Sequence, residues 1–186
     1  MNIDKGWKKY QPDESTSNCV VFLMNHFAAI GTGLGLAVGG AAGVTAASIG
    51  FPVSRLANGE WWGIFPVLLA LVVLAVTHEL IHFAFSNWKQ SRFIFVPRYC
   101  ALAVELHGKF SKWRYLACLM APTLIISTLI VPALRFDSPI LMAMAIVNLG
   151  GSGMDWVSAA LVIAVIKGNK VLLDGNDAYL PVTPNG

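Results

Sequence analysis

The sequence predicts an all-α membrane protein with about four transmembrane helices and a short cytoplasmic β-hairpin between the second and the third helix. Of the 186 residues, 56% are hydrophobic and 12% are charged, whereas soluble domains average about 45–50% and about 25%. Four apolar runs occupy most of the chain and leave no room for a separate soluble core. We therefore expect a single polytopic membrane domain over residues 20–166, between cytoplasmic segments 1–19 and 167–186.

The first two apolar runs extend from Val20 to Ile49 and from Trp61 to Phe85, and both are long enough to span a bilayer. The tryptophans at 61 and 62 stand where an interfacial aromatic belt is expected. In the first run, small residues recur at four-residue intervals and predict a groove where another helix backbone approaches closely. These residues are Gly31, Gly35, Gly39 and Gly43, continued by Ala47.

The last two apolar runs contain residues that interrupt a regular helix. The third covers Tyr115 to Leu134 and includes Pro122 and Pro132. The fourth covers Ile140 to Ile166 and is interrupted by glycines and by Asp155. Helix-breaking residues are tolerated in a span where neighbouring protein satisfies the freed backbone groups. We therefore expect both runs to line protein or a cavity.

A short β-hairpin is predicted between the second and third runs. Two segments rich in β-forming residues, Phe93–Val96 and Ala101–Leu106, flank the turn-like residues 97–100. At the membrane surface, an exposed strand edge can hold an extended peptide by strand addition. A purely structural hairpin is the alternative.

The basic residues predict the orientation of the chain in the cell (inner) membrane. Eleven of the thirteen lie before the first run, between the second and third, or after the fourth. The positive-inside rule then places both termini and segment 86–114 in the cytoplasm. The net charge of +3 therefore reflects topology, and we expect no nucleic-acid partner. Unpaired spacing predicts that Cys19, Cys100 and Cys118 are reduced and structural.

Residues 76–85, Val-Thr-His-Glu-Leu-Ile-His-Phe-Ala-Phe, contain a His-Glu-x-x-His motif inside the second run. A random shuffle of this composition would produce the motif roughly 0.002 times per chain. Each ionisable residue in a span costs on the order of 3 kcal/mol, which a bound zinc ion would offset. His78 and His82 project from one helix face and can reach one cation. Glu79 is placed to accept a proton from a water that the metal acidifies. The alternative is a buried cluster in which these side chains form hydrogen bonds and hold no metal.

A catalytic zinc needs a third protein ligand, and Asp155 is the best candidate because a carboxylate in the fourth run otherwise lacks a partner. Asn148 and Ser152 share its helical face by spacing. Glu105 and His107 are rival ligands. His26 and Ser152 are candidates for supporting the ligands by hydrogen bonds.

These residues resemble a known family. His78-Glu79-Leu80-Ile81-His82, followed by Asn148 and Asp155, resembles the site-2 protease class of intramembrane zinc metalloproteases, and more closely the small bacterial membrane proteins grouped as "putative zincin peptidases". The resemblance covers residues 61–166. It implies that His78, His82 and Asp155 ligate zinc, that Glu79 is the catalytic base, and that Asn148 holds the substrate or the oxyanion.

The chain departs from the site-2 protease pattern in the fourth run. Site-2 proteases typically carry Asn-x-x-Pro followed by Asp-Gly. Here Gly151 stands at the proline position, Asp155 comes one residue early, and Trp156 follows it.

The sequence therefore predicts a membrane-embedded zinc metalloprotease that acts on a membrane protein or peptide substrate in the lipid bilayer. Two alternatives are a non-catalytic zinc-binding membrane protein, such as a transporter element, and an inactive protease-like partner. Glu79 separates these classes, because metal transport needs ligands but no positioned base. A transporter also tends to carry further ionisable residues along a path through its spans, and this chain has only His26 there.

Overall fold

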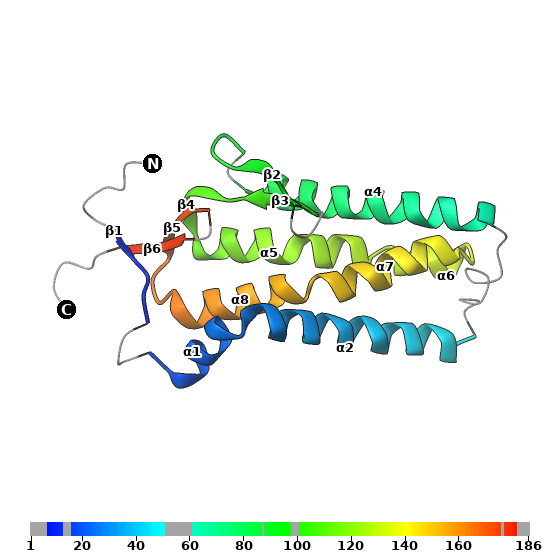
Figure 1. Cartoon of the computed structure of the whole chain (residues 1–186), viewed down its shortest axis with the longest axis horizontal. Coiled ribbons are helices and arrows are strands. Elements are labelled where there is room, and N and C mark those ends of the chain that lie inside the picture. Colours follow the sequence, from blue (N-terminus) through cyan, green and yellow to red (C-terminus); the bar gives the residue numbers. More distant parts are fainter. Residues whose placement is uncertain are drawn as a thin grey trace.

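A computed structural model describes residues 7–12, 16–50, 61–86, 88–97, 101–175 and 177–181. The long helices lie side by side, and two small sheets lie toward one end of the helical bundle (Figure 1). The described helices are α1 (Asn18–Asn25), α2 (Phe27–Ser48), α4 (Trp61–Phe85), α5 (Lys112–Ser127), α6 (Ile130–Arg135), α7 (Pro139–Gly151) and α8 (Gly153–Val165).

Up to four helical segments are long and apolar enough to cross a membrane. Three are continuous by this criterion: Phe27–Ser48, Phe65–Phe85 and Lys112–Arg135. The fourth is the pair α7 and α8, which is bent by 42° and counts as one span only if the pair is taken together. Each segment overlaps one of the four predicted apolar runs: Phe27–Ser48 and Phe65–Phe85 lie within theirs, whereas Lys112–Arg135 extends beyond Tyr115–Leu134 at both ends and α7 begins one residue before Ile140. The side chains of Trp61 and Trp62, predicted to be interfacial, lie outside the described part of the structure.

The predicted glycine groove of α2 packs against α7 and α8 along part of its length. A Cβ atom at Gly35 would overlap the carbonyl oxygen of Gly150, and one at Gly39 would lie 2.9 Å from the Gly150 Cα. Backbone-to-backbone contact therefore requires glycine here. The groove does not extend to Gly43, where an added Cβ would meet nothing within 4 Å. Ala46 is buried there instead, in a cluster with Ala133 and Met142.

The outward faces of α2 and α4 carry exposed apolar side chains. Leu36 is 71% exposed, Phe65 is 68% exposed and Val72 is 61% exposed. Soluble monomers rarely expose contiguous apolar surface of this kind. This pattern agrees with the apolar composition that singled out these helices.

The predicted hairpin is present as an antiparallel pair of strands, β2 (Arg92–Val96) and β3 (Ala101–Glu105). Its register places Phe93 opposite Val104 and Val96 opposite Ala101. The second strand ends at Glu105, one residue before the predicted end. Residues 98–100 of the predicted turn, including Cys100, lie outside the described residues.

A second, four-stranded sheet makes the chain mostly helical rather than all-α. Its order is β1–β6–β5–β4, and all of its pairs are antiparallel. The strands are β1 (Trp7–Lys9), β4 (His107–Ser111), β5 (Lys170–Asp174) and β6 (Asp177–Pro181). The two predicted flanking segments therefore each contain strands, and β1 pairs directly with β6.

A buried cluster fixes this sheet to the helices. Phe110 and Val171 from the sheet pack with Leu119 of α5 and with Ala159 and Val162 of α8. Because α5 and α8 also pack against one another, the sheet closes one end of the helix bundle. Near the middle of this bundle, α4, α5 and α8 bring the predicted site residues together.

Candidate metal centre

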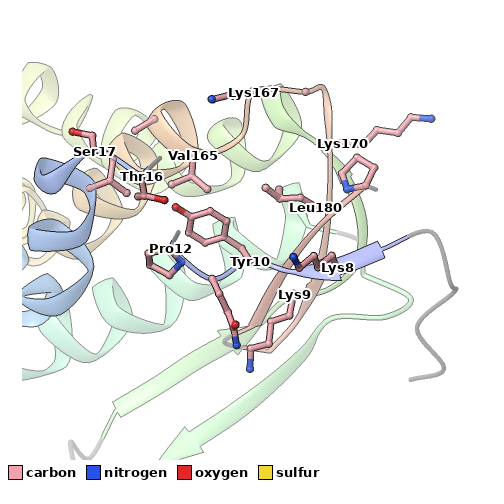
Figure 2. Close-up of a pocket in the computed structure, with 15 residues that line it drawn as sticks. Lys8, Lys9, Tyr10, Pro12, Thr16, Ser17, Val165, Lys167, Lys170 and Leu180 are labelled. Atoms are coloured by element: carbon pink, nitrogen blue, oxygen red, sulfur yellow. The ribbon is translucent and has the colours of Figure 1, made fainter. Parts of the chain in front are cut away.

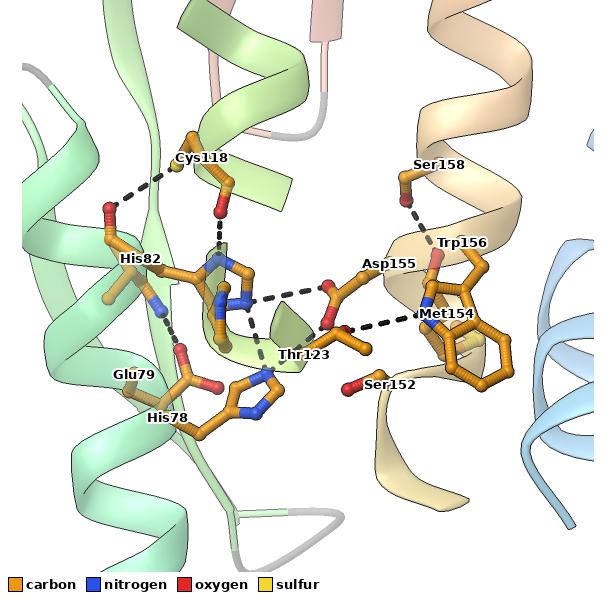
Figure 3. Close-up of polar contacts among 12 residues, drawn as sticks. His78, Glu79, His82, Cys118, Thr123, Ser152, Met154, Asp155, Trp156 and Ser158 are labelled. Atoms are coloured by element: carbon orange, nitrogen blue, oxygen red, sulfur yellow. Dashed lines mark hydrogen bonds and ion pairs between the residues drawn. The ribbon is translucent and has the colours of Figure 1, made fainter. Parts of the chain in front are cut away.

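His78, His82 and Asp155 converge at the interface of α4 and α8, as Figure 3 shows. Their ligand atoms all lie within 4.8 Å of one another. The two histidines are one turn apart on α4, so their rings project from the same face. Asp155 lies in the first turn of α8, just after the break that separates α7 from α8. This break directs the start of α8 and its carboxylate toward α4.

The distances within this group fit a tetrahedral zinc site. The Nε2 atoms of His78 and His82 are 3.1 Å apart. Asp155 Oδ2 lies 3.2 Å from His78 Nε2, and Asp155 Oδ1 lies 3.4 Å from His82 Nε2. A tetrahedral zinc with bonds of about 2.0–2.2 Å places its ligand atoms about 3.3–3.6 Å apart. Two imidazoles and one carboxylate also form a known ligand set of catalytic zinc sites.

The hydrogen bonds on the far side of each ring select the tautomer that a metal ligand needs. His82 Nδ1 lies 2.8 Å from the Cys118 carbonyl oxygen and donates to it. His78 Nδ1 lies 2.9 Å from Asn148 Oδ1. The amide of Asn148 is oriented by its Nδ2, which donates to the Pro122 carbonyl at 3.4 Å, so Oδ1 accepts from His78. Both Nε2 atoms therefore carry the lone pair that binds a cation.

Pro122 explains why a helix carbonyl is available to His82. In a regular helix, the carbonyl of residue 118 accepts the N–H of residue 122. Proline has no N–H, and its ring displaces the carbonyl four residues earlier. The Cys118 carbonyl is thereby free to accept from the imidazole. The Cys118 side chain is fully buried, and its thiol donates to the His82 carbonyl at 3.2 Å, which adds a second contact between α4 and α5.

Glu79 lies beside this group but outside it. Its Oε2 accepts the backbone N–H of Val104 at 3.0 Å. In the hairpin, Val104 is opposite Phe93, and an N–H that bonds Glu79 points away from β2, toward the free edge of β3. In the part of the chain that the structure describes, this edge of β3 pairs with no other strand, and it runs past the Glu79 carboxylate. Among the described residues, no hydrogen bond engages Glu79 Oε1.

The structure places Asn148, predicted to hold the substrate or the oxyanion, and the predicted supporting residues Ser152 and His26 differently. Asn148 is 3% exposed and contacts His78, as described above. Ser152 is fully buried, and its hydroxyl donates to the backbone carbonyl of Asn148 at 2.8 Å. It therefore contacts Asn148 and not the histidines themselves. His26 lies between α1 and α2, and its Nδ1 is 3.1 Å from the Phe22 carbonyl oxygen. The structure does not bring His26 into the ligand group.

The rival ligands Glu105 and His107 form a separate polar cluster. Glu105 Oε2 lies 2.7 Å from Arg92 Nε and 3.1 Å from His107 Nε2. His107 Nδ1 lies 2.8 Å from Asp174 Oδ1. The hydrogen bond from Arg92, followed by that from His107, lowers the pKa of Glu105 below its ordinary value. These contacts connect the hairpin to the four-stranded sheet, and neither rival belongs to the group formed by His78, His82 and Asp155.

Two backbone groups in this site were not predicted from sequence: the Cys118 carbonyl and the Val104 N–H. Pro122 was a usable signal for the first, because a proline inside a predicted helix frees the carbonyl four residues before it. The second had no such signal, since backbone donors at a strand edge carry no residue-type signature.

The family comparison agrees with the motif. Residues 71–169, more than half of the 186-residue chain, match the family described as "Putative zincin peptidase". No match was found among curated proteins or among solved structures. The matched segment includes His78, Glu79, His82 and Asp155 and ends just before strand β5. The chain belongs to this zincin-like peptidase family.

Proposed function

We propose that the protein is a membrane-embedded zinc metallopeptidase that hydrolyses peptide bonds of membrane-associated or transmembrane substrates. His78, His82 and Asp155 would hold the zinc ion, and Glu79 would be the general base. The observation that carries the proposal is the convergence of two imidazole lone pairs and one carboxylate at 3.1–3.4 Å, with a further carboxylate beside them that is not a ligand. The family match supports the same class of reaction.

When bound, zinc would lower the pKa of a coordinated water toward neutrality and polarise the scissile carbonyl. The chain's own residues then handle the protons. Glu79 Oε1 takes a proton from the attacking water as the carbon–oxygen bond forms, and then delivers this proton to the amide nitrogen, so that the carbon–nitrogen bond breaks and the amine leaves. The Val104 N–H holds Oε2 and thereby keeps Oε1 directed at the reacting groups. We propose that Asn148 acts as a positioning residue for His78.

The free edge of β3 is the proposed docking site for an extended substrate. A transmembrane helix hides its amide bonds in hydrogen bonds and has to unwind before hydrolysis. An added strand on β3 would satisfy the exposed backbone groups of the unwound segment. The contact between Val104 and Glu79 means that a peptide on this edge would lie next to the base.

The same proposal places the protein in the cell (inner) membrane as a multi-pass protein with both termini in the cytoplasm. The four apolar helical segments support the crossings. The basic residues before α2, between α4 and α5, and after α8 support the orientation. The domain boundaries at residues 20 and 166 are part of this proposal.

Comparing membrane-protein fragments between wild type and Glu79→Gln tests the proposed hydrolysis. Both forms are expressed in cells that lack the endogenous protein, together with a single-span substrate. We expect Glu79→Gln to retain zinc and lose most cleavage, because general base catalysis contributes about 10²–10⁴-fold. As a control, Glu60→Gln makes the same type of substitution in the segment between α2 and α4, and this variant should cleave the substrate normally.

The alternative reading is a zinc-binding protein without hydrolysis, or an inactive protease-like partner. Identical fragments from wild type and Glu79→Gln, with zinc retained in both, would favour it. Zinc analysis of His78→Ala/His82→Ala separates this alternative from a buried hydrogen-bonded cluster of His78, Glu79 and His82 that holds no metal. We expect about one zinc per wild-type chain and loss of zinc in the double variant. Equal zinc content in the two proteins would show that His78 and His82 do not bind zinc, and would exclude both the protease and the non-catalytic zinc-binding protein.

A further inference from the structure

A basic cavity lies at the end of the bundle where α1 begins and α8 ends, apart from the metal centre. Its volume is about 850 Å³. Four chain segments enclose it: residues 8–12, the start of α1, residues 164–170 and the end of β6. Figure 2 shows these segments around the open space, with Tyr10, Thr16 and Ser17 lining it from one side. The proposed hydrolysis does not use these residues.

The polar lining of the cavity carries positive charge. Lys8, Lys9, Lys167 and Lys170 all line it. Lys9 is already paired, because its Nζ lies 2.7 Å from Asp177. No carboxylate lines the cavity among the residues that the structure describes, and none of those residues pairs with Lys8 or Lys167. The hydroxyls of Tyr10 and Ser17 add hydrogen-bonding groups to this basic lining.

The carboxyl end of α8 would ordinarily place negative partial charge beside the cavity. Lys112 counters it from α5. Its Nζ donates to the Ile163 carbonyl at 3.1 Å and to the Ile166 carbonyl at 2.7 Å. The ammonium group therefore satisfies two carbonyls at this end of α8 and reduces the negative charge that an anion in the cavity would meet.

The rest of the lining is apolar and continues onto exposed helix surface. Val20, Val165 and Leu180 form apolar walls. Next to the cavity, Phe22 of α1 is 55% exposed and Ile163 of α8 is 61% exposed. A ligand of the cavity would thus place an anionic group among lysines and an apolar tail along α1 and α8. This combination matches an amphiphile better than a free anion.

We propose that this cavity binds the phosphate-bearing headgroup of an anionic phospholipid, with the acyl chains along α1 and α8. This inference rests on the proposed membrane orientation, in which the cavity lies at the cytoplasmic ends of the helices, where the basic residues cluster and an anionic headgroup is available. Lys8 and Lys167 supply the charge, and the hydroxyls of Tyr10 and Ser17 bind phosphate oxygens. Basic pockets at the cytoplasmic ends of membrane helices bind lipid headgroups in this way.

The test uses the full-length protein in neutral detergent with three separate probes: short-chain phosphatidylglycerol, short-chain phosphatidylcholine and inorganic phosphate. Binding is followed by native mass spectrometry and by the shift in thermal unfolding temperature. We expect saturable binding and stabilisation with phosphatidylglycerol only. In Lys8→Gln/Lys167→Gln, phosphatidylglycerol affinity should fall about 30-fold, since each basic residue near a charged surface contributes roughly fivefold.

A charge-matched double variant, Lys89→Gln/Arg135→Gln, removes two basic residues outside the cavity and should bind phosphatidylglycerol as wild type does. Three results overturn the proposal. Phosphatidylcholine binding as tight as phosphatidylglycerol binding would remove the role of charge. Equal stabilisation by inorganic phosphate would identify a free-anion site. Unchanged phosphatidylglycerol affinity in the cavity variant, which cooperative thermal unfolding shows to be folded, would place the lipid elsewhere.

Discussion

Replacing Pro122 by alanine tests how α5 prepares the metal site. In the native protein the Cys118 carbonyl oxygen lies 2.8 Å from His82 Nδ1. The substitution restores a backbone N–H at residue 122 that competes with His82 for this carbonyl. Loss of a hydrogen-bond partner behind a metal-ligating histidine typically weakens metal binding about 10–100-fold. A carbonyl has two lone pairs, so the imidazole is weakened as a ligand but keeps some contact. We therefore expect the zinc dissociation constant to rise about tenfold.

The same substitution should weaken zinc binding but increase the stability of the fold. Proline in a helix interior costs about 3 kcal/mol relative to alanine. Pro122 is fully buried, and removing two of its methylenes costs about 0.8 kcal/mol each. The free energy of unfolding of the metal-free protein should therefore rise by about 1 kcal/mol. If the variant is more stable but binds zinc more weakly, Pro122 serves to leave the Cys118 carbonyl available to His82.

The assay is a zinc competition titration against a chromophoric chelator in detergent, together with thermal unfolding of the metal-free protein. Pro132→Ala is the matched control, because it makes the same change in α6, far from any ligand. It should leave zinc affinity unchanged. If Pro122→Ala binds zinc as tightly as wild type and Pro132→Ala, the proposed role of the freed carbonyl is wrong.

Three further outcomes are expected. Asn148→Ala should weaken zinc binding about 10–100-fold by removing the acceptor of His78 Nδ1, and Asn148→Asp, which keeps an acceptor, should lose less in the same chelator titration. Asp155→Ala should lower zinc retention in metal analysis, whereas Glu105→Ala should not; the reverse ranking would move the third ligand to the hairpin. Gly35→Ala should destabilise the fold by about 1–3 kcal/mol through overlap with the Gly150 carbonyl, while Gly43→Ala, which meets open space, should not lower the unfolding temperature in detergent.

The four apolar helical segments were predictable because composition and run length decide them. The juxtaposition of His78 and His82 was also predictable, since four-residue spacing fixes a shared helix face. The approach of Asp155 followed from a chemical argument about the missing ligand, and the break at Ser152 provides its geometry.

The four-stranded sheet was missed because its strands come from segments far apart in the chain. One local signal was present. Asp174 pairs with Asp177, so Gly175-Asn176 connects the two strands, and Gly-Asn between two short strand segments is a hairpin signal. Gly175 has a φ of 63°, the left-handed conformation that favours glycine in a tight turn. The pairing of β1 with β6 had no comparable signal, because it depends on long-range assembly.

X-ray absorption at the zinc edge of the purified protein tests the ligand set on which this account depends. We predict one zinc per chain, coordinated only by nitrogen and oxygen at about 2.0–2.2 Å, with the multiple scattering of two imidazoles. Cys118 lies next to the site, and its thiol contacts the His82 carbonyl. A sulfur ligand at about 2.3 Å, or the signal of fewer than two imidazoles, would contradict the centre formed by His78, His82 and Asp155.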